Sequence, residues 1–328
     1  MFVFGFSRGA YAARMLAGMI YISGVPDIRA DPRQPNHPDN SRLQGRIKCV
    51  YEAQRSNGRS LQYRADRVAR VIRADSEMRE WRMQRATIAF MGLFDTVEEL
   101  NAIQSISAIY KRRELRNIEP TNKHHVDQLC NVRKVAHAMS LDDNRADTFT
   151  PKLLTRKVFA EMCLRGERVE IDSVVHEVWF AGAHSDVGGR RDTELDDVPL
   201  NWMIKQMEPY DLLRGDTLYA DPHGKASKPR DKAWKWIFYP EGNRRVELYL
   251  GAESTRYNAG RLKVHQSVIS RLESDSVPRH RWQSEWYTAP LFRSCFSVRN
   301  RPKSTDRIKR TDSLHFTPTE SCRVNVER

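Results

Sequence analysis

Three residues of the chain have the types and the order needed for nucleophilic cleavage of an ester. Residues 5–9 read G-F-S-R-G, a G-x-S-x-G pattern around Ser7, and Asp95 and His184 follow it. In a set of this kind the serine attacks a carbonyl carbon, and the histidine takes its proton and later protonates the leaving group. The aspartate orients and stabilises the imidazolium. The sequence therefore predicts Ser7 as nucleophile, His184 as base and Asp95 as acid.

The residues around Ser7 have the strand–turn–helix pattern in which a G-x-S-x-G motif indicates a nucleophilic serine. A short apolar run precedes Ser7 and a small-residue amphipathic segment follows, so we expect a strand over 2–6 and a helix over about 8–22. The motif alone is weak, since its three fixed positions occur by chance in about one chain of this length in ten. In this context the two glycines permit a strained turn and close packing of helix on strand. The backbone N–H of Arg8 is the predicted oxyanion donor.

Two later apolar runs are expected to bring Asp95 and His184 to Ser7. Residues 86–94 and 174–182 are nearly continuous apolar runs, typical of strands buried on both faces of a parallel sheet. Asp95 directly follows the first run and His184 lies just after the second. Because the carboxyl ends of parallel strands share one edge of a sheet, these side chains should converge there.

Helical patterns lie between or after these strands, and alternation of this kind predicts βαβ units and an α/β fold. A stretch rich in Pro, Asp and Asn is expected to be a loop at residues 23–40. The helical patterns fall at residues 65–83, 97–115, 131–140 and 197–208.

Each predicted site residue also has a competing interpretation. Taken on its own, Asp95 is better explained as the N-cap of a following helix, a common use of Asp after a strand. His137 stands in an expected helix beside Asp142 and Asp143 and is a competing base. Asp186 is a rival acid, or a residue that binds a cation or shapes the turn before a double glycine.

The chain is strongly basic, with 55 Lys and Arg against 42 Asp and Glu among 328 residues and a formal net charge of +13. Arg-rich stretches at 64–85 and 299–310 are typical of a solvated helical face and a poorly ordered tail. The alternative is attraction to the phosphates of lipid head groups or nucleic acid. No RNP-type, zinc-finger or basic-zipper pattern is present, which argues against nucleic acid as a partner.

The cysteines and the N-terminus bear on cellular location. Five widely spaced cysteines without C-x-x-C argue against a zinc site or a disulfide framework and favour a reducing compartment. The longest apolar stretch, residues 15–22, is too short to span a bilayer, and no signal peptide precedes the first strand. We therefore expect synthesis in the cytoplasm and no metal or other cofactor. The cysteines are Cys49, Cys130, Cys163, Cys295 and Cys322.

Six segments, in order, resemble the motifs of the uncharacterised α/β-hydrolase family that includes the catalytic domain of class-one type VI secretion phospholipase effectors. The resemblance implies a serine esterase of phospholipase A type, acting on the carboxylic esters of glycerophospholipids. It places the family's nucleophile on Ser7, its aspartate on Asp95 and its histidine on His184. The segments are GFSRGAYAAR (5–14), FMGLFDTV (90–97), HAMSLDDNRADTF (137–149), VWFAGAHSDVGG (178–189), DDVPLNWM (196–203) and VHQSVISR (264–271).

The resemblance also implies a fold, partners and a route. The fold is an α/β-hydrolase-like, mostly parallel sheet with helices on both faces. The substrate is a phospholipid or another ester, met through transient contact with a membrane surface. A secretion adaptor, an immunity protein and export by a type VI system are further implications.

The chain departs from the family pattern before Ser7. The family has a strand and a D-G-T-type turn well upstream of the serine, and neither occurs here. We therefore expect a sheet without its N-terminal strands, with the strand at 2–6 exposed at an edge, and one oxyanion donor fewer. An alternative hypothesis is an inactive, truncated remnant or a binding module of the same fold.

The expected organisation has three parts. Residues 1–210 form the catalytic core, residues 211–298 a C-terminal part of the same domain or a cap, and residues 299–328 a basic tail. Four tryptophans in the second part are expected to pack on the core, with a ligand pocket as the alternative. They are Trp234, Trp236, Trp282 and Trp286.

Overall fold

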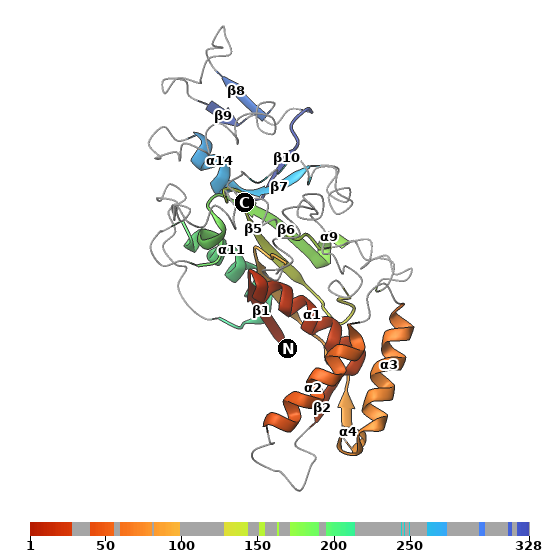
Figure 1. The fold of residues 1–328 in the computed structure, drawn as a ribbon. Coiled ribbons are helices and arrows are strands. Elements are labelled where there is room, and N and C mark those ends of the chain that lie inside the picture. The colour runs from red at the N-terminus through yellow and green to blue at the C-terminus, as the bar shows by residue number, and fades with distance from the viewer. Residues whose placement is uncertain are drawn as a thin grey trace, which may run out of the picture.

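A computed structural model gives the fold of the chain (Figure 1). The segment expected as a helix at 97–115 falls outside the described residues from position 99 onward, as do the four tryptophans named above. The described residues are 1–27, 40–55, 60–80, 82–98, 128–143, 151–154, 163, 171–189, 195–213, 244, 246, 249, 261–273, 295–298, 314–316 and 320–327.

The described residues build one sheet of six parallel strands, in the order β1-β4-β5-β6-β7-β10. This confirms the predicted α/β fold with a mostly parallel sheet. Strands β1, β4, β5 and β6 keep a common register, so their carboxyl ends lie at one edge. The strands are β1 (Phe2–Phe6), β4 (Phe90–Phe94), β5 (Val135–Ser140), β6 (Val175–Phe180), β7 (Leu262–His265) and β10 (Val324–Glu327).

Helix α1 (Arg8–Ser23) covers one face of the sheet, as Figure 1 shows. Its buried alanines at 10, 13 and 17 belong to a core cluster with Met91 and Leu93 of β4. Small side chains on the inner face of the helix let it approach the strands closely. The expected helix over about 8–22 is therefore confirmed.

Helix α11 (Asp197–Met207) covers the opposite face. Its Trp202 packs edge-on against Phe180 of β6, with ring centroids 5.4 Å apart, and Met203 joins the same cluster. Phe90 of β4 also faces this cluster, because successive side chains of a strand point to opposite faces. The helix expected at 197–208 and the presence of helices on both faces are thus confirmed.

One predicted helix is wrong. Within residues 131–140, Val135–Ser140 form the central strand β5, and all six residues of this strand are buried. A short apolar run buried on both faces of a sheet has no alternation of apolar and polar residues, so periodicity does not separate it from a buried helix. His137 therefore lies on a strand in the middle of the sheet.

Other expected elements differ in their ends or their division. The strand expected from residue 86 begins at Phe90, and the strand expected over 174–182 is β6. The helix expected over 65–83 is divided into α3 and α4, and the expected loop after α1 contains a short strand paired antiparallel with another. The helices and strands of the region from residue 25 to residue 84 are β2 (Val25–Asp27), α2 (Asn40–Gln54), α3 (Leu61–Ala74), α4 (Ser76–Glu80) and β3 (Arg82–Gln84).

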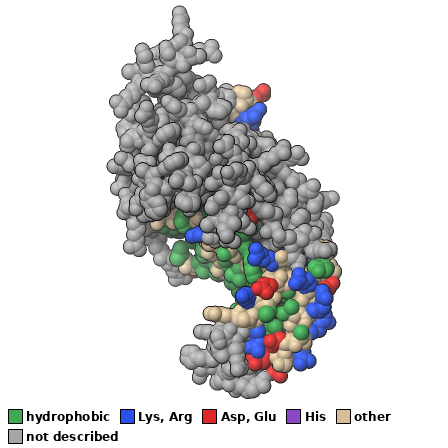
Figure 2. Space-filling model, viewed as in Figure 1, with side chains coloured by type: hydrophobic (Ala, Val, Ile, Leu, Met, Phe, Trp, Pro, Cys, Tyr) green, Lys and Arg blue, Asp and Glu red, His purple; other side chains and the backbone are tan. Residues whose placement is uncertain are grey.

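The region of α2, α3 and α4 carries part of the basic stretch. Figure 2 shows Lys and Arg side chains interspersed with Asp and Glu over this part of the surface. Arg46 pairs there with Asp75 at 3.1 Å and with Glu77 at 2.6 Å. Arg64 is buried, and burial lowers the pKa of its guanidinium. The described part of the stretch is therefore a helical surface of mixed charge that includes the buried Arg64.

The C-terminal part of the chain contributes to the central sheet. β7 and β10 form its far side and pair in parallel. Residues 324–327 lie within the expected basic tail, but they form a sheet strand whose Glu327 accepts a hydrogen bond from the indole of Trp202 at 2.9 Å. The remaining described elements are α9 (Ile171–Val174), α10 (His184–Val187), a 3-10 turn (Glu208–Tyr210), α14 (Gln266–Glu273), and the paired strands β8 (Phe296–Val298) and β9 (Leu314–Phe316).

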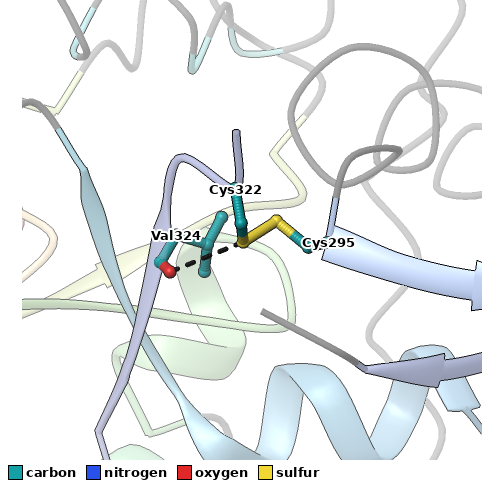
Figure 3. Close-up of a disulfide and its surroundings, with 3 residues drawn as sticks. All are labelled: Cys295, Cys322 and Val324. Carbon is teal, nitrogen blue, oxygen red and sulfur yellow. Dashed lines mark hydrogen bonds between the residues drawn. A yellow bond between two sulfur atoms is a disulfide. The ribbon is translucent and has the colours of Figure 1, made fainter. Parts of the chain in front are cut away.

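Two disulfides correct the expectation that the cysteines form none. Cys130 bonds to Cys163, and Cys295 bonds to Cys322. Cys322 lies just before β10, with its Sγ 3.7 Å from the carbonyl oxygen of Val324 (Figure 3). The partners are 33 and 27 residues apart, and pairings of this kind are not readable from spacing alone.

Removing the second disulfide should destabilise the protein. A Cys295→Ser/Cys322→Ser variant should lose about 3–4 kcal/mol of unfolding free energy, because the crosslink limits the freedom of the unfolded chain. Chemical denaturation under oxidising conditions measures this loss. Cys49→Ser is the matched control, since Cys49 is an exposed free thiol. Equal stability of the two variants would contradict the prediction.

Strand β1 is an edge strand of the sheet, as expected from the sequence. It pairs with β4 alone among the described residues. Phe2, Phe4 and Phe6 remain 37%, 47% and 38% exposed.

In the described part of the chain, no helix is both long enough and apolar enough to cross a bilayer.

Candidate active site

Ser7 occupies a strained turn between β1 and α1. Its backbone has φ 58° and ψ −124°, a conformation that non-glycine residues rarely adopt. The Ser7 N–H donates to Phe94 O at 2.9 Å, which ties the turn to the end of β4. A Cβ at Gly5 would lie 2.5 Å from Gly9 O, so only glycine lets α1 pack this closely on β1. The first glycine of the motif therefore has a steric role.

The two glycines of the motif should respond differently to alanine. Gly5→Ala should lower the unfolding free energy by about 2–3 kcal/mol, because its Cβ meets rigid backbone. Gly9→Ala should leave stability unchanged or raise it by up to about 1 kcal/mol, because open space surrounds Gly9 and alanine favours a helix. Denaturant unfolding of both variants measures the difference. Equal losses would show that the close approach of α1 to β1 does not depend on Gly5.

His184 contacts Ser7 across the edge of the sheet. Its Nε2 accepts a hydrogen bond from Ser7 Oγ at 2.9 Å, although the two residues are 177 positions apart. His184 is the first residue of α10, and its backbone N–H donates to Asp143 Oδ2 at 3.2 Å. Phe6 packs on its ring with centroids 4.6 Å apart. A Cβ at Gly188 would clash with Phe6, so this glycine makes room for the ring.

Asp95 lies on the other side of the His184 ring. Its Oδ2 accepts the hydrogen bond from His184 Nδ1 at 2.5 Å, and its Oδ1 accepts from Ser140 N–H at 3.0 Å. The residue is fully buried and has φ 43°. These contacts disfavour the alternative role of Asp95 as a helix cap. The structure thus joins Ser7, His184 and Asp95 in one chain of hydrogen bonds.

Arg244, which no motif in the sequence singles out, contacts Asp95. Its Nη1 and Nη2 donate to Asp95 Oδ1 and Oδ2 at 2.9 and 2.7 Å, and Nη1 also donates to Ser140 O. Burial by itself would raise the pKa of Asp95. The charge of Arg244 and the hydrogen bonds from Arg244 and His184 outweigh burial, so that this pKa lies well below its usual range. The Asp95 carboxylate is therefore ionised throughout the pH range in which histidine side chains ordinarily titrate.

His137 is not placed to act on Ser7 as a base. Its Nε2 accepts from Thr96 N–H at 3.2 Å, so its Nδ1 carries the proton and donates to Glu177 Oε1 at 3.2 Å. Glu177 also accepts from Leu154 N–H at 2.8 Å. This buried pair supports the backbone directly after Asp95.

The acidic residues near His184 accept hydrogen bonds from backbone N–H groups of the turn before it. Asp186 is fully buried and accepts from Ala183 N–H at 2.8 Å, so it shapes the turn and is not the acid on His184. Asp142 accepts from Gly182 N–H in the same way. Among the residues that the structure describes, no group of three or more His, Cys, Asp or Glu side chains is arranged to hold a metal ion.

The fold and the site define a class of protein. A parallel sheet with helices on both faces places a serine on a sharp strand-to-helix turn, with a histidine and an aspartate at the ends of later strands. This architecture is that of α/β-hydrolases.

A comparison with models of known protein families then shows to which family the chain belongs. Residues 1–206 match the family of type VI secretion (T6SS) phospholipase effector Tle1-like catalytic domains. The match spans more than half of the chain, so the chain belongs to this family, as its motifs suggested. Membership supports a lipolytic phospholipase function, a lipid substrate and secretion. Searches of curated proteins and of solved structures gave no significant match.

Proposed function

We propose that the chain is a serine hydrolase that cleaves carboxylic esters of glycerophospholipids through Ser7, His184 and Asp95. The observation that carries the proposal is the hydrogen-bonded chain from Ser7 Oγ through His184 to the ionised carboxylate of Asp95. This arrangement makes a serine hydroxyl nucleophilic. Family membership supports the lipid substrate.

In the proposed reaction each residue has a role in one or both of two steps. Ser7 Oγ attacks the ester carbonyl as His184 Nε2 takes its proton, and the lysophospholipid leaves with that proton, giving an acyl-enzyme. Water then loses a proton to His184 and attacks the acyl group, which releases the fatty acid and restores Ser7. Asp95 accepts a hydrogen bond from His184 Nδ1, which keeps the proton of the neutral ring on Nδ1, and it stabilises the imidazolium. Arg8, the first residue of α1, offers its N–H to the oxyanion.

The same proposal includes location and partners. The chain is synthesised in the cytoplasm and exported by a type VI system, with a secretion adaptor or an immunity protein as partner and transient contact with a membrane surface. Two disulfides support an oxidising destination. Phospholipid head groups are anionic, and the net charge of +13 favours attraction to them.

Vesicles of a phosphatidylglycerol and phosphatidylethanolamine with different acyl chains at their two positions test the proposal. We expect mass spectrometry to detect free fatty acid and lysophospholipid in equal amounts, and neither with Ser7→Ala. Diacylglycerol or phosphatidic acid as product, or equal release by Ser7→Ala, would contradict it. Vesicle binding without any product would support the alternative of a binding module.

A further inference from the structure

Arg244 lies outside the region that matches the family, yet it reaches the carboxylate at the centre of the site. The matched region ends at residue 206. Arg244 is 2% exposed, and its guanidinium forms two hydrogen bonds to Asp95 and one to Ser140 O. Burying a cation is costly unless it is paired with an anion. The buried guanidinium of Arg244 therefore depends on its contact with the carboxylate of Asp95.

We propose that Arg244 is a positioning residue that fixes the Asp95 carboxylate opposite His184 Nδ1 and sets the pH below which the Asp95–His184 pair takes up a proton. The proposal rests on the proposed function of these residues. It adds that a segment beyond the family match completes the active site.

The geometry of the three groups supports a fixed carboxylate. Arg244 grips both oxygens of Asp95 with its planar fork, and Ser140 N–H donates to Oδ1 from the end of β5. Only the remaining direction on Oδ2 is left for His184 Nδ1. A lysine has one point of attachment and does not hold both oxygens in this way.

The charge of Arg244 has a separate effect. The Asp95–His184 pair gains a positive charge when it takes up a proton, and a buried cation in contact with Asp95 opposes that step. Loss of Arg244 should therefore move proton uptake to higher pH. Other ionisable groups that face the cluster are Asp143, which accepts from His184 N–H and interacts with Arg244, and Tyr249, which interacts with Arg244 and Asp95.

Arg14 provides a matched control. It is also a fully buried arginine, but its guanidinium donates to backbone carbonyls, Lys152 O at 2.7 Å and Leu153 O at 3.0 Å. It thus shares with Arg244 the burial and the hydrogen bonds. It lacks the contact with the Asp95–His184 pair.

The test is a pH titration of ¹⁵N-histidine-labelled full chain by NMR, with the His184 ring assigned from the spectrum of His184→Ala. In Arg244→Gln the midpoint of proton uptake should rise by about one pH unit or more relative to wild type. Arg14→Gln should leave the midpoint in place. An unchanged midpoint in Arg244→Gln, or an equal rise in Arg14→Gln, would overturn the proposal.

Arg244→Lys separates geometry from charge and also serves if Arg244→Gln does not fold. Its midpoint should stay near that of wild type, while kcat for ester hydrolysis falls about tenfold and KM is unchanged. Wild-type kcat in Arg244→Lys would overturn the positioning role. The NMR titration does not require turnover, so an inactive wild-type chain would refute the proposed function and still leave the result on Arg244 readable.

Discussion

Ser7→Ala and His184→Ala should each lower kcat/KM for phospholipid ester hydrolysis by about 10⁴-fold or more. In the proposed reaction Ser7 supplies the attacking oxygen, and His184 Nε2, 2.9 Å from it, is the base that removes its proton. Because the two act as one unit, the double variant should be hardly worse than either single variant. Steady-state rates of fatty acid release measure this.

Ser23→Ala is the control for the loss of a hydroxyl. Ser23 Oγ donates to backbone carbonyls at the end of α1 and has no contact with His184. Its rate should equal that of wild type. If Ser7→Ala retained a substantial rate, the nucleophile would have to be another group. If the losses in Ser7→Ala and His184→Ala multiplied in the double variant, the two residues would not act in one step.

Asp95→Asn should lower kcat by about 10³–10⁴-fold with little change of KM. An amide in place of the carboxylate donates toward His184 and favours the wrong tautomer, and it leaves Arg244 buried without its counter-ion. The variant should therefore also lose about 3 kcal/mol or more of unfolding free energy. Initial rates and denaturant unfolding measure the two effects separately.

Asp186→Asn is the matched control for Asp95→Asn. Asp186 is equally buried and lies two residues from His184, but it accepts from the backbone N–H of Ala183 and does not contact the ring. Its loss of kcat should be far smaller than that of Asp95→Asn. Equal losses in both variants would mean that His184 depends on the shape of its turn and not on the charge of Asp95.

The positions of the candidate site residues could be predicted because each lies at, or a few residues after, the end of an element with a clear local signal. Ser7 lies between an apolar run and a small-residue helix, and Asp95 follows the apolar run that ends in β4. His184 comes four residues after β6. The common register of the strands then brings their ends together, which parallel pairing requires.

The rest of the site depends on contacts that have no local signal. Arg244 meets Asp95 across 149 residues, and no motif or periodicity surrounds it. β5 is buried on both faces, so its sequence does not distinguish it from a buried helix, and the predicted helical setting of His137 is wrong. The disulfide to Cys322 and the pairing of β10 likewise join segments distant in sequence. Such pairings are decided by packing and not by the local pattern.

Labelling with a fluorophosphonate probe tests the central claim most directly, because only an activated serine attacks this reagent. We expect the wild-type chain to gain one probe adduct, peptide mapping to place it on Ser7, and Ser7→Ala and His184→Ala to gain none. The geometry around Ser7 and His184 is the basis for this expectation. An adduct on another residue, or equal labelling of wild type and Ser7→Ala, would contradict the assignment of the nucleophile and with it the proposed reaction.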